Sequence, residues 1–155
     1  MMKSVDNLIR LFREKGFKIT AQRRLIFELL AGDDSHPTAE EIYERVISVM
    51  PEVSRTTVYN TLRELVALGE LTEVDDPNQS GTRYDTNPGH HHHLFCMRCG
   101  ALTDVARDFE SVRLSPEEAE GYRIVKSQVT FYGYCPKCQR AQRNRRIHPK
   151  VTRGR

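Results

Sequence analysis

Apolar residues recur at helical spacing through the first half of the chain, and polar caps separate the runs. One run begins after Ser4, a residue type that caps helix N-termini, and ends at Gly16. Another begins at Thr20 and ends at Gly32. The stripe predicted to be buried in this second run consists of Leu25, Ile26, Leu29 and Leu30. The pattern therefore predicts two amphipathic helices.

Two further runs follow, and their starts are clearer. Thr38 and Glu41 have the T-x-x-E spacing of a capping box, and Met50-Pro51 ends the helix that follows them. Ser54 caps the fourth run, which continues to Gly69. The residues predicted to face inward are Ile42, Val46 and Val49 in the third helix and Val58, Leu62, Leu65 and Val66 in the fourth. The short turn between these helices predicts a helix-turn-helix.

Two short segments of strand-like composition come next. Residues 71–74 and 82–86 flank a polar turn at 75–81, which contains proline and glycine. This arrangement predicts a β-hairpin. A helix-turn-helix followed directly by a hairpin is a winged helix.

The fourth predicted helix has a polar face built from residue types that contact DNA. The candidate DNA-binding residues are Arg55, Thr56, Thr57, Tyr59, Asn60 and Arg63 on this helix, with Lys18 and Arg23 from the basic N-terminal part of the chain. Cations and hydrogen-bonding side chains on such a helix reach phosphates and base edges in the major groove. The alternative is that each exposed cation only solvates its helix. The capped helix pair, the wing and the basic residues together favour nucleic acid.

The second half of the chain contains all four cysteines, as the pairs Cys96/Cys99 and Cys135/Cys138. A strand-like stretch from Tyr122 to Tyr134 can bring the pairs together. Four thiolates in two chelating pairs suit tetrahedral Zn²⁺, and a closed shell of four makes the ion structural. Two redox-active disulfides are the competing interpretation.

Four consecutive histidines, 90–93, lie directly before the first cysteine pair. On a strand, His91 and His93 would point to one face and His90 and His92 to the other, which gives two candidate pairs of imidazole ligands. A polar surface run without a ligand role is the alternative. Further candidate donors are His36, Asp85 and Asp104, which spacing alone does not join to the histidines.

Composition narrows the class of protein. The 155 residues include 24 Lys and Arg against 21 Asp and Glu, a formal charge of +3 that divides into +5 for residues 1–24, −9 for 25–138 and +7 for 139–155. Only parts of the surface should therefore meet an anion. No apolar run approaches the ~18 residues that span a bilayer, so we expect a cytoplasmic protein without a membrane partner. Phosphate-loop, nucleophile-elbow and zincin motifs are absent, so we expect no enzyme.

Five segments, at 19–24, 36–43, 54–62, 82–85 and 91–100, resemble the ferric uptake regulator (Fur) family of bacterial metal-dependent repressors. The resemblance extends from about Leu8 to Cys138. It implies an α+β protein with a winged helix-turn-helix DNA-binding domain at 1–86, a small α/β dimerisation domain with structural zinc at 87–140 and a basic tail at 141–155. It also implies a homodimer that binds double-stranded, inverted-repeat operator DNA.

The same resemblance implies the roles of the metal-binding residues. The residues that correspond to the structural Zn²⁺ ligands are Cys96, Cys99, Cys135 and Cys138. Those that correspond to the regulatory ligands are His36, Asp85, His91, His93 and Asp104. Three imidazoles and two carboxylates suit Fe²⁺ or Mn²⁺. Some relatives have an additional site, which would use His90, His92 and Glu110. Ser127 stands where those relatives have histidine, so we expect this additional set to be incomplete.

Aspartate at positions 85 and 104 makes the chain similar to the peroxide-responsive subgroup of the family. In that subgroup Fe²⁺ reacts with H₂O₂ and a ligand histidine is oxidised, and the corresponding positions are His36 and His91. We therefore predict a peroxide-responsive repressor. An iron-uptake or zinc-uptake regulator is the alternative of the same class, and a thiol-redox or metal-storage protein is the alternative from another class.

Overall fold

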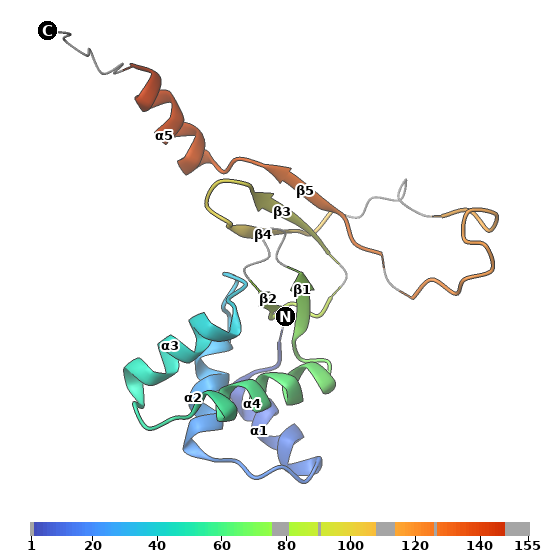
Figure 1. Ribbon diagram of the computed structural model, residues 1–155. Helices are drawn as coiled ribbons and strands as arrows, with labels where there is room; N and C mark the ends of the chain where they lie inside the picture. The colour runs from blue at the N-terminus through green and yellow to red at the C-terminus, as the bar shows by residue number, and fades with distance from the viewer. Residues whose placement is uncertain (1, 76–80, 90, 108–113, 126, 148–155) are drawn as a thin grey trace, which may run out of the picture. The chain divides into compact units, whose positions relative to one another are not determined.

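The computed structural model describes residues 2–75, 81–89, 91–107, 114–125 and 127–147, with side chains as far as Ala141. The chain divides into two compact units, Met1–His90 and His91–Arg155. Among the described residues the first unit contains helices α1 to α4 and strands β1 and β2, and the second contains strands β3 to β5 and helix α5 (Figure 1). No described helix is both long and apolar enough to cross a bilayer.

Helices α1 (Val5–Glu14) and α2 (Ala21–Leu30) form where the apolar pattern predicts them. Thr20 caps α2 by accepting a hydrogen bond from the Arg23 N–H. Ser4 occupies the N-cap of α1, but its side chain makes no capping hydrogen bond, so that part of the prediction is wrong. The Ser4 carbonyl accepts the ordinary first backbone hydrogen bond of the helix, from the Leu8 N–H.

Helix α3 (Ala39–Val49) begins with the predicted capping box of Thr38 and Glu41. Ile42 and Val46 are buried in the core, as predicted. Val49 is 63% exposed, which contradicts its predicted inward position. The helix ends at Val49, and Val53, beyond the turn, is the next apolar residue that enters the core.

Helix α4 (Arg55–Ala67) starts at Ser54, whose hydroxyl accepts a hydrogen bond from the Thr57 N–H. Its inner face buries Val58, Leu62 and Leu65 against α2 and α3. Helices α2, α3 and α4 all contact one another. Only residues 50–54 separate α3 from α4, so the pair forms the predicted helix-turn-helix.

Strands β1 (Thr72–Asp75) and β2 (Thr82–Asp85) pair in antiparallel fashion, with Thr72 opposite Asp85. They form the predicted wing, and residues 76–80 of its turn lie outside the described residues. An isolated bridge also joins β2 to the segment before α3, between Arg83 and Thr38. The end of the wing is therefore attached to the start of the helix-turn-helix.

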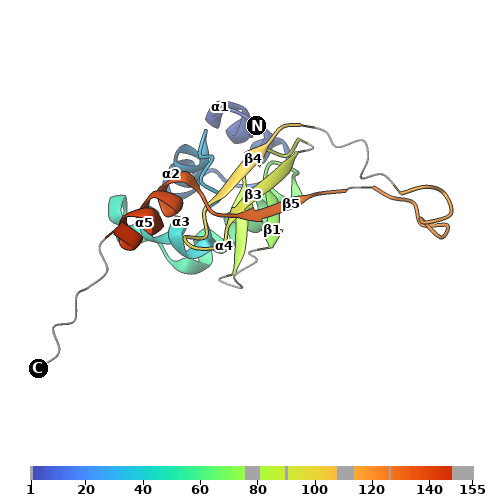
Figure 2. The same cartoon turned by 90° about the horizontal axis from the view of Figure 1, so that it is seen from above.

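The second unit is built on a sheet in the order β4-β3-β5, which Figure 2 shows from above. Strand β3 (His92–Cys96) pairs antiparallel with β4 (Leu102–Val105) and parallel with β5 (Thr130–Gly133). The predicted strand from Tyr122 to Tyr134 is thus much shorter in the structure. The extended pairing begins only where β3 offers a backbone partner, at His93 opposite Thr130.

Helix α5 (Pro136–Ile147) follows β5 directly and includes the first part of the basic extension. The basic tail predicted for residues 141–155 therefore starts within a helix. Residues 148–155 of this tail lie outside the described residues.

Replacement of Leu62 by Ala should destabilise the first unit. The fully buried side chain would leave a cavity, and we expect the free energy of unfolding to fall by about 2–5 kcal/mol. Urea unfolding followed by far-ultraviolet circular dichroism measures the change. The control is Val49→Ala at the exposed end of α3, for which we expect a change within about 0.5 kcal/mol. Equal losses in the two variants would contradict the assigned core.

Candidate metal centres and DNA-contacting surface

The four cysteines come together at one end of the sheet in the second unit. Cys96 ends β3, Cys99 lies in the turn that follows, Cys135 follows β5 and Cys138 lies in the first turn of α5. Parallel pairing of β3 with β5 places Cys96 opposite Gly133 and so brings the two pairs together. The four Sγ atoms lie within 4.8 Å of one another. This is a compact set of four soft ligands.

All four cysteines are free thiols in the structure. The sulfur atoms of Cys99 and Cys135 are 3.7 Å apart, much farther than the ~2.05 Å of a disulfide bond. The backbone N–H of Cys135 donates to Cys96 Sγ and lowers the pKa of that thiol to about 6. Desolvation, together with the neighbouring thiols, raises the pKa of Cys138 to about 12. A divalent cation would stabilise the thiolate form of all four, and tetrahedral Zn²⁺ fits the donor set.

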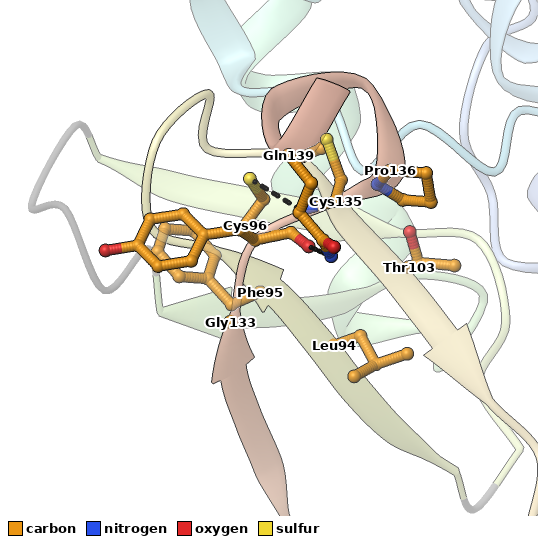
Figure 3. Close-up of a pocket in the computed structure, with 10 residues that line it drawn as sticks. Leu94, Phe95, Cys96, Thr103, Gly133, Cys135, Pro136 and Gln139 are labelled. Atoms are coloured by element: carbon orange, nitrogen blue, oxygen red, sulfur yellow. Dashed lines mark hydrogen bonds between the residues drawn. The ribbon is translucent and has the colours of Figure 1, made fainter. Parts of the chain in front are cut away.

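A cavity of about 460 Å³ adjoins the cysteine cluster (Figure 3). Its walls include Leu94, Thr103 and Pro136 beside Cys96 and Cys135, as Figure 3 shows. Leu94 is 48% exposed. The face of the sheet that carries Leu94 is therefore partly apolar next to the cysteine cluster.

His36 and Asp85 form a buried pair within the first unit. His36 lies in the loop before α3 and Asp85 ends β2, and each side chain is only 2% exposed. His36 Nε2 is 3.7 Å from Asp85 Oδ1. His36 Nδ1 lies 3.0 Å from the Asp34 carbonyl oxygen, which can only accept, so this nitrogen carries the proton. In this tautomer Nε2 offers its lone pair on the side of Asp85, an arrangement common among metal-ligating histidines.

A second set of donors lies within the second unit, where His91 and His93 are buried and the Asp104 side chain is 31% exposed. His93 in β3 stands opposite Asp104 in β4, and His91 precedes β3. The Nε2 atoms of His91 and His93 are 3.1 Å apart, and Asp104 Oδ1 lies 3.5 Å from the first and 3.6 Å from the second. These two nitrogens and one oxygen converge on a common point. The donor types fit Fe²⁺, Mn²⁺ or Zn²⁺.

His92 points away from this set, as the alternation of strand side chains predicts. Its ring Nδ1 accepts a hydrogen bond from the Val129 N–H, which fastens the chain ahead of β5 to β3. His90 and Glu110, the other predicted members of the additional site, lie outside the described residues. Gln128, which was not among the predicted site residues, places its amide nitrogen 3.0 Å from His93 Nδ1.

The candidate DNA-binding residues of α4 lie on its outer surface. Arg55, Thr56, Tyr59, Asn60 and Arg63 are exposed, and Thr57 is half-buried. Among the described residues, neither Lys18 nor Arg63 forms an ion pair, and Lys18 is likewise exposed. These two cations are available to an external anion.

Arg23 and Arg55 have partners inside the protein that the sequence did not reveal. Arg23 Nη2 lies 2.7 Å from both carboxylate oxygens of Glu64, and its guanidinium lies over the rings of Phe12 and Phe17. Its side chain is only 17% exposed, so Arg23 ties α2 to α4. Arg55 pairs with Glu40 and lies 4.3 Å from the centre of the Tyr43 ring. A DNA phosphate would have to compete with these contacts.

The model of the ferric uptake regulator family matches residues 14–132. The chain belongs to this family. A curated Fur-family relative, the peroxide-responsive repressor PerR of Staphylococcus epidermidis, is 30% identical over 136 residues, which cover 87% of this chain and 90% of the relative.

Solved structures of Fur-family proteins agree with the fold. PerR from Streptococcus pyogenes, described in a structural study of peroxide sensing and gene regulation, is 33% identical with a TM-score of 0.51 and covers 89% of this chain and 95% of that one. The Vibrio cholerae ferric uptake regulator is 27% identical with a TM-score of 0.63, and the match covers 83% of this chain and 99% of that one. Both the winged helix-turn-helix and the small second domain are thus shared with the family.

Removal of one cysteine should release zinc. We expect the purified protein to hold one zinc ion per chain that resists a brief chelator treatment, and Cys99→Ser to lose it because three thiolates no longer close the site. Elemental analysis after chelation measures the difference. Met97→Ser, at an exposed position in the same turn, is the control and should keep its zinc. Equal retention by both variants would contradict a four-cysteine zinc site.

Proposed function

We propose that this protein is a metal-dependent transcriptional repressor that binds inverted-repeat operator DNA as a homodimer and responds to peroxide through oxidation of a ligand histidine. The observation that carries the proposal is a pair of His and Asp sets, with all three histidines and Asp85 buried, in addition to the cysteine cluster. These sets occur in a Fur-family chain whose helix α4 has an exposed polar surface.

The DNA-binding part of the proposal rests on α4 and the wing. The exposed Tyr59, Asn60 and Arg63 lie on one side of α4, opposite the buried Val58 and Leu62. Such a helix enters the major groove with these side chains toward the base edges. An inverted repeat requires a second copy related by two-fold symmetry.

The homodimer is supported by the surface of the second unit. Large apolar and aromatic side chains are exposed on and after β3 and β5, namely Leu94, Met97, Phe131, Tyr132 and Tyr134. Strand β5 also lies at the edge of its sheet. Apolar patches beside an open edge are typical of surfaces that another chain covers. A second copy of this unit would bury them.

For the regulatory metal, we propose that His36 and Asp85 act together with His91, His93 and Asp104 in the loaded protein. Each set alone supplies fewer donors than the six that Fe²⁺ or Mn²⁺ ordinarily takes, and the two sets belong to the DNA-binding unit and the dimerisation unit. An ion held by both units would favour the arrangement that matches the operator. Its effect is bounded by its difference in affinity for the competing arrangements.

In the proposed sensing step, peroxide oxidises the imidazole of His36 or His91. A bound Fe²⁺ would supply the one-electron chemistry that activates H₂O₂. The net change would be the gain of one oxygen atom by an imidazole carbon of His36 or His91, with H₂O₂ as the oxidant and water as the other product. An oxidised ring is a poorer ligand, so the metal and then the DNA would be released.

Loss of the Arg63 guanidinium should weaken DNA binding. We expect Arg63→Ala to bind duplexes selected from a random library by the metal-loaded wild type less tightly, and the slope of log affinity against log salt to fall by about 1 if the guanidinium meets a phosphate. Fluorescence anisotropy across a salt series measures both. Arg123→Ala, an exposed arginine of the second unit, is the matched control and should bind as the wild type does. Unchanged binding by Arg63→Ala would remove α4 from the interface.

Mild peroxide should modify the Fe²⁺-loaded protein in a site-specific way. We expect a mass increase of about 16 Da on His36 or His91, accompanied by loss of operator binding. Peptide mass spectrometry locates the oxygen, and Mn²⁺-loaded protein is the control that should stay unmodified. Operator binding that follows metal concentration yet survives peroxide without histidine oxidation would instead identify an iron-uptake or zinc-uptake regulator.

A further inference from the structure

The loop that carries His36 has an unusual backbone conformation. His36 adopts φ +51°, and among the described residues Glu120 is the only other non-glycine residue with a positive φ. A left-handed residue other than glycine costs free energy, and surrounding contacts must hold it in place. Those contacts come from the end of β2, on both sides of Asp85.

Three hydrogen bonds join the end of β2 to this loop. Arg83 Nη1 donates to the His36 carbonyl oxygen at 3.0 Å, and the Tyr84 N–H donates to the Pro37 carbonyl oxygen at 2.9 Å. Thr86 Oγ1 donates to the Asp33 carbonyl oxygen at 2.8 Å. We call Arg83, Tyr84 and Thr86 the loop clamp. Its members bracket Asp85 in sequence, so they bring the loop of one ligand against the strand of the other.

The loop clamp is itself braced on both sides. Asp33 accepts a hydrogen bond from the Ser35 N–H and pairs with Arg45 of α3, which fixes the start of the loop to that helix. On the other side, the Met2 N–H donates to the Thr86 carbonyl oxygen. Thr86 is 6% exposed, so its hydroxyl is committed to the bond that it makes. The hydroxyl of Thr86 and the guanidinium of Arg83 are the only side-chain donors of the clamp.

We propose that Arg83 and Thr86 are positioning residues for the regulatory metal. They hold His36 in its left-handed conformation beside Asp85, so that two ligands are in place before the ion arrives. A ligand pair that is already ordered binds with less loss of conformational freedom, and groups that orient metal ligands typically change affinity by about 10–100-fold. This inference rests on the proposed regulatory site and adds the residues that set its affinity.

Two substitutions at position 86 separate positioning from simple packing. Thr86→Val keeps the shape of the side chain and removes the hydroxyl, whereas Thr86→Ser keeps the hydroxyl and removes a methyl group. In zinc-loaded, full-length protein titrated with Mn²⁺ and followed by the electron paramagnetic resonance of unbound Mn²⁺, we expect Thr86→Val to bind about 10-fold more weakly or worse. Thr86→Ser should stay within about twofold of the wild type, because the donor remains.

Arg83→Met provides an independent variant, because it removes the guanidinium and keeps an unbranched side chain. It should also weaken Mn²⁺ binding. Hydrogen exchange of the Tyr84 amide should be faster in Arg83→Met and Thr86→Val, while that of the buried Leu62 amide should be unchanged, which shows that only the loop has loosened. Wild-type Mn²⁺ affinity in both variants, despite faster Tyr84 exchange, would overturn the proposal.

Asp85→Asn, which alters a proposed ligand, sets the scale of the titration. We expect the clamp variants to lie between the wild type and Asp85→Asn. If the wild type binds Mn²⁺ no better than Asp85→Asn, the proposed regulatory site itself is wrong, and the positioning role fails with it. If only the clamp variants match the wild type, the site stands and the positioning role alone is wrong.

Discussion

The second unit buries very little apolar surface, and much of the chemistry of the protein follows from this deficit. Among its described residues the buried hydrophobic ones are Phe95, Cys96 and Leu102, whereas the first unit has a continuous core drawn from all four of its helices. A unit with so small a core needs a metal, a cross-link or a partner chain to stay folded. The cysteine cluster ties β3 to the start of α5, and the exposed aromatic surface offers burial against a second copy.

The same deficit bears on the residues to which we assign metal sensing. Buried positions that would hold apolar side chains in a larger domain are occupied by His91, His92 and His93 in the second unit. The first unit likewise buries His36 and Asp85 beside its core. Buried polar groups cost free energy unless they are hydrogen-bonded or bound to an ion, and in the proposed function the cation would add a further interaction for His36, Asp85, His91 and His93. In the proposed function, loss of that cation therefore changes the arrangement of the units as well as the charge of the site.

The distribution of charge is also more specific than the net value of +3 indicates. Arg23 belongs to the basic N-terminal segment, yet its guanidinium binds Glu64 and lies over two phenylalanine rings, and so it joins α2 to α4. Arg63 and Lys18 remain exposed for an external anion. Arg23, although predicted to contact DNA, thus stabilises the helices that form the proposed DNA-binding surface.

The sequence by itself determined the features that depend on near neighbours along the chain. Caps at Thr20, Thr38 and Ser54 begin helices where predicted, because a cap acts within one helical turn. The alternation of side chains along a strand placed His91 and His93 together. The family resemblance supplied the grouping of the distant ligands, which no local pattern could provide.

Only the tertiary structure decided which distant residues lie against one another. It exposed Val49 at the end of α3, limited the last strand to the length that β3 can pair with, and gave Arg23 its partner Glu64. It also brought Arg83 to the carbonyl of His36 and gave that histidine its left-handed backbone. These contacts join residues tens of positions apart, and they leave no periodicity in the sequence because their partners are chosen by the packing of helices and strands that are already formed.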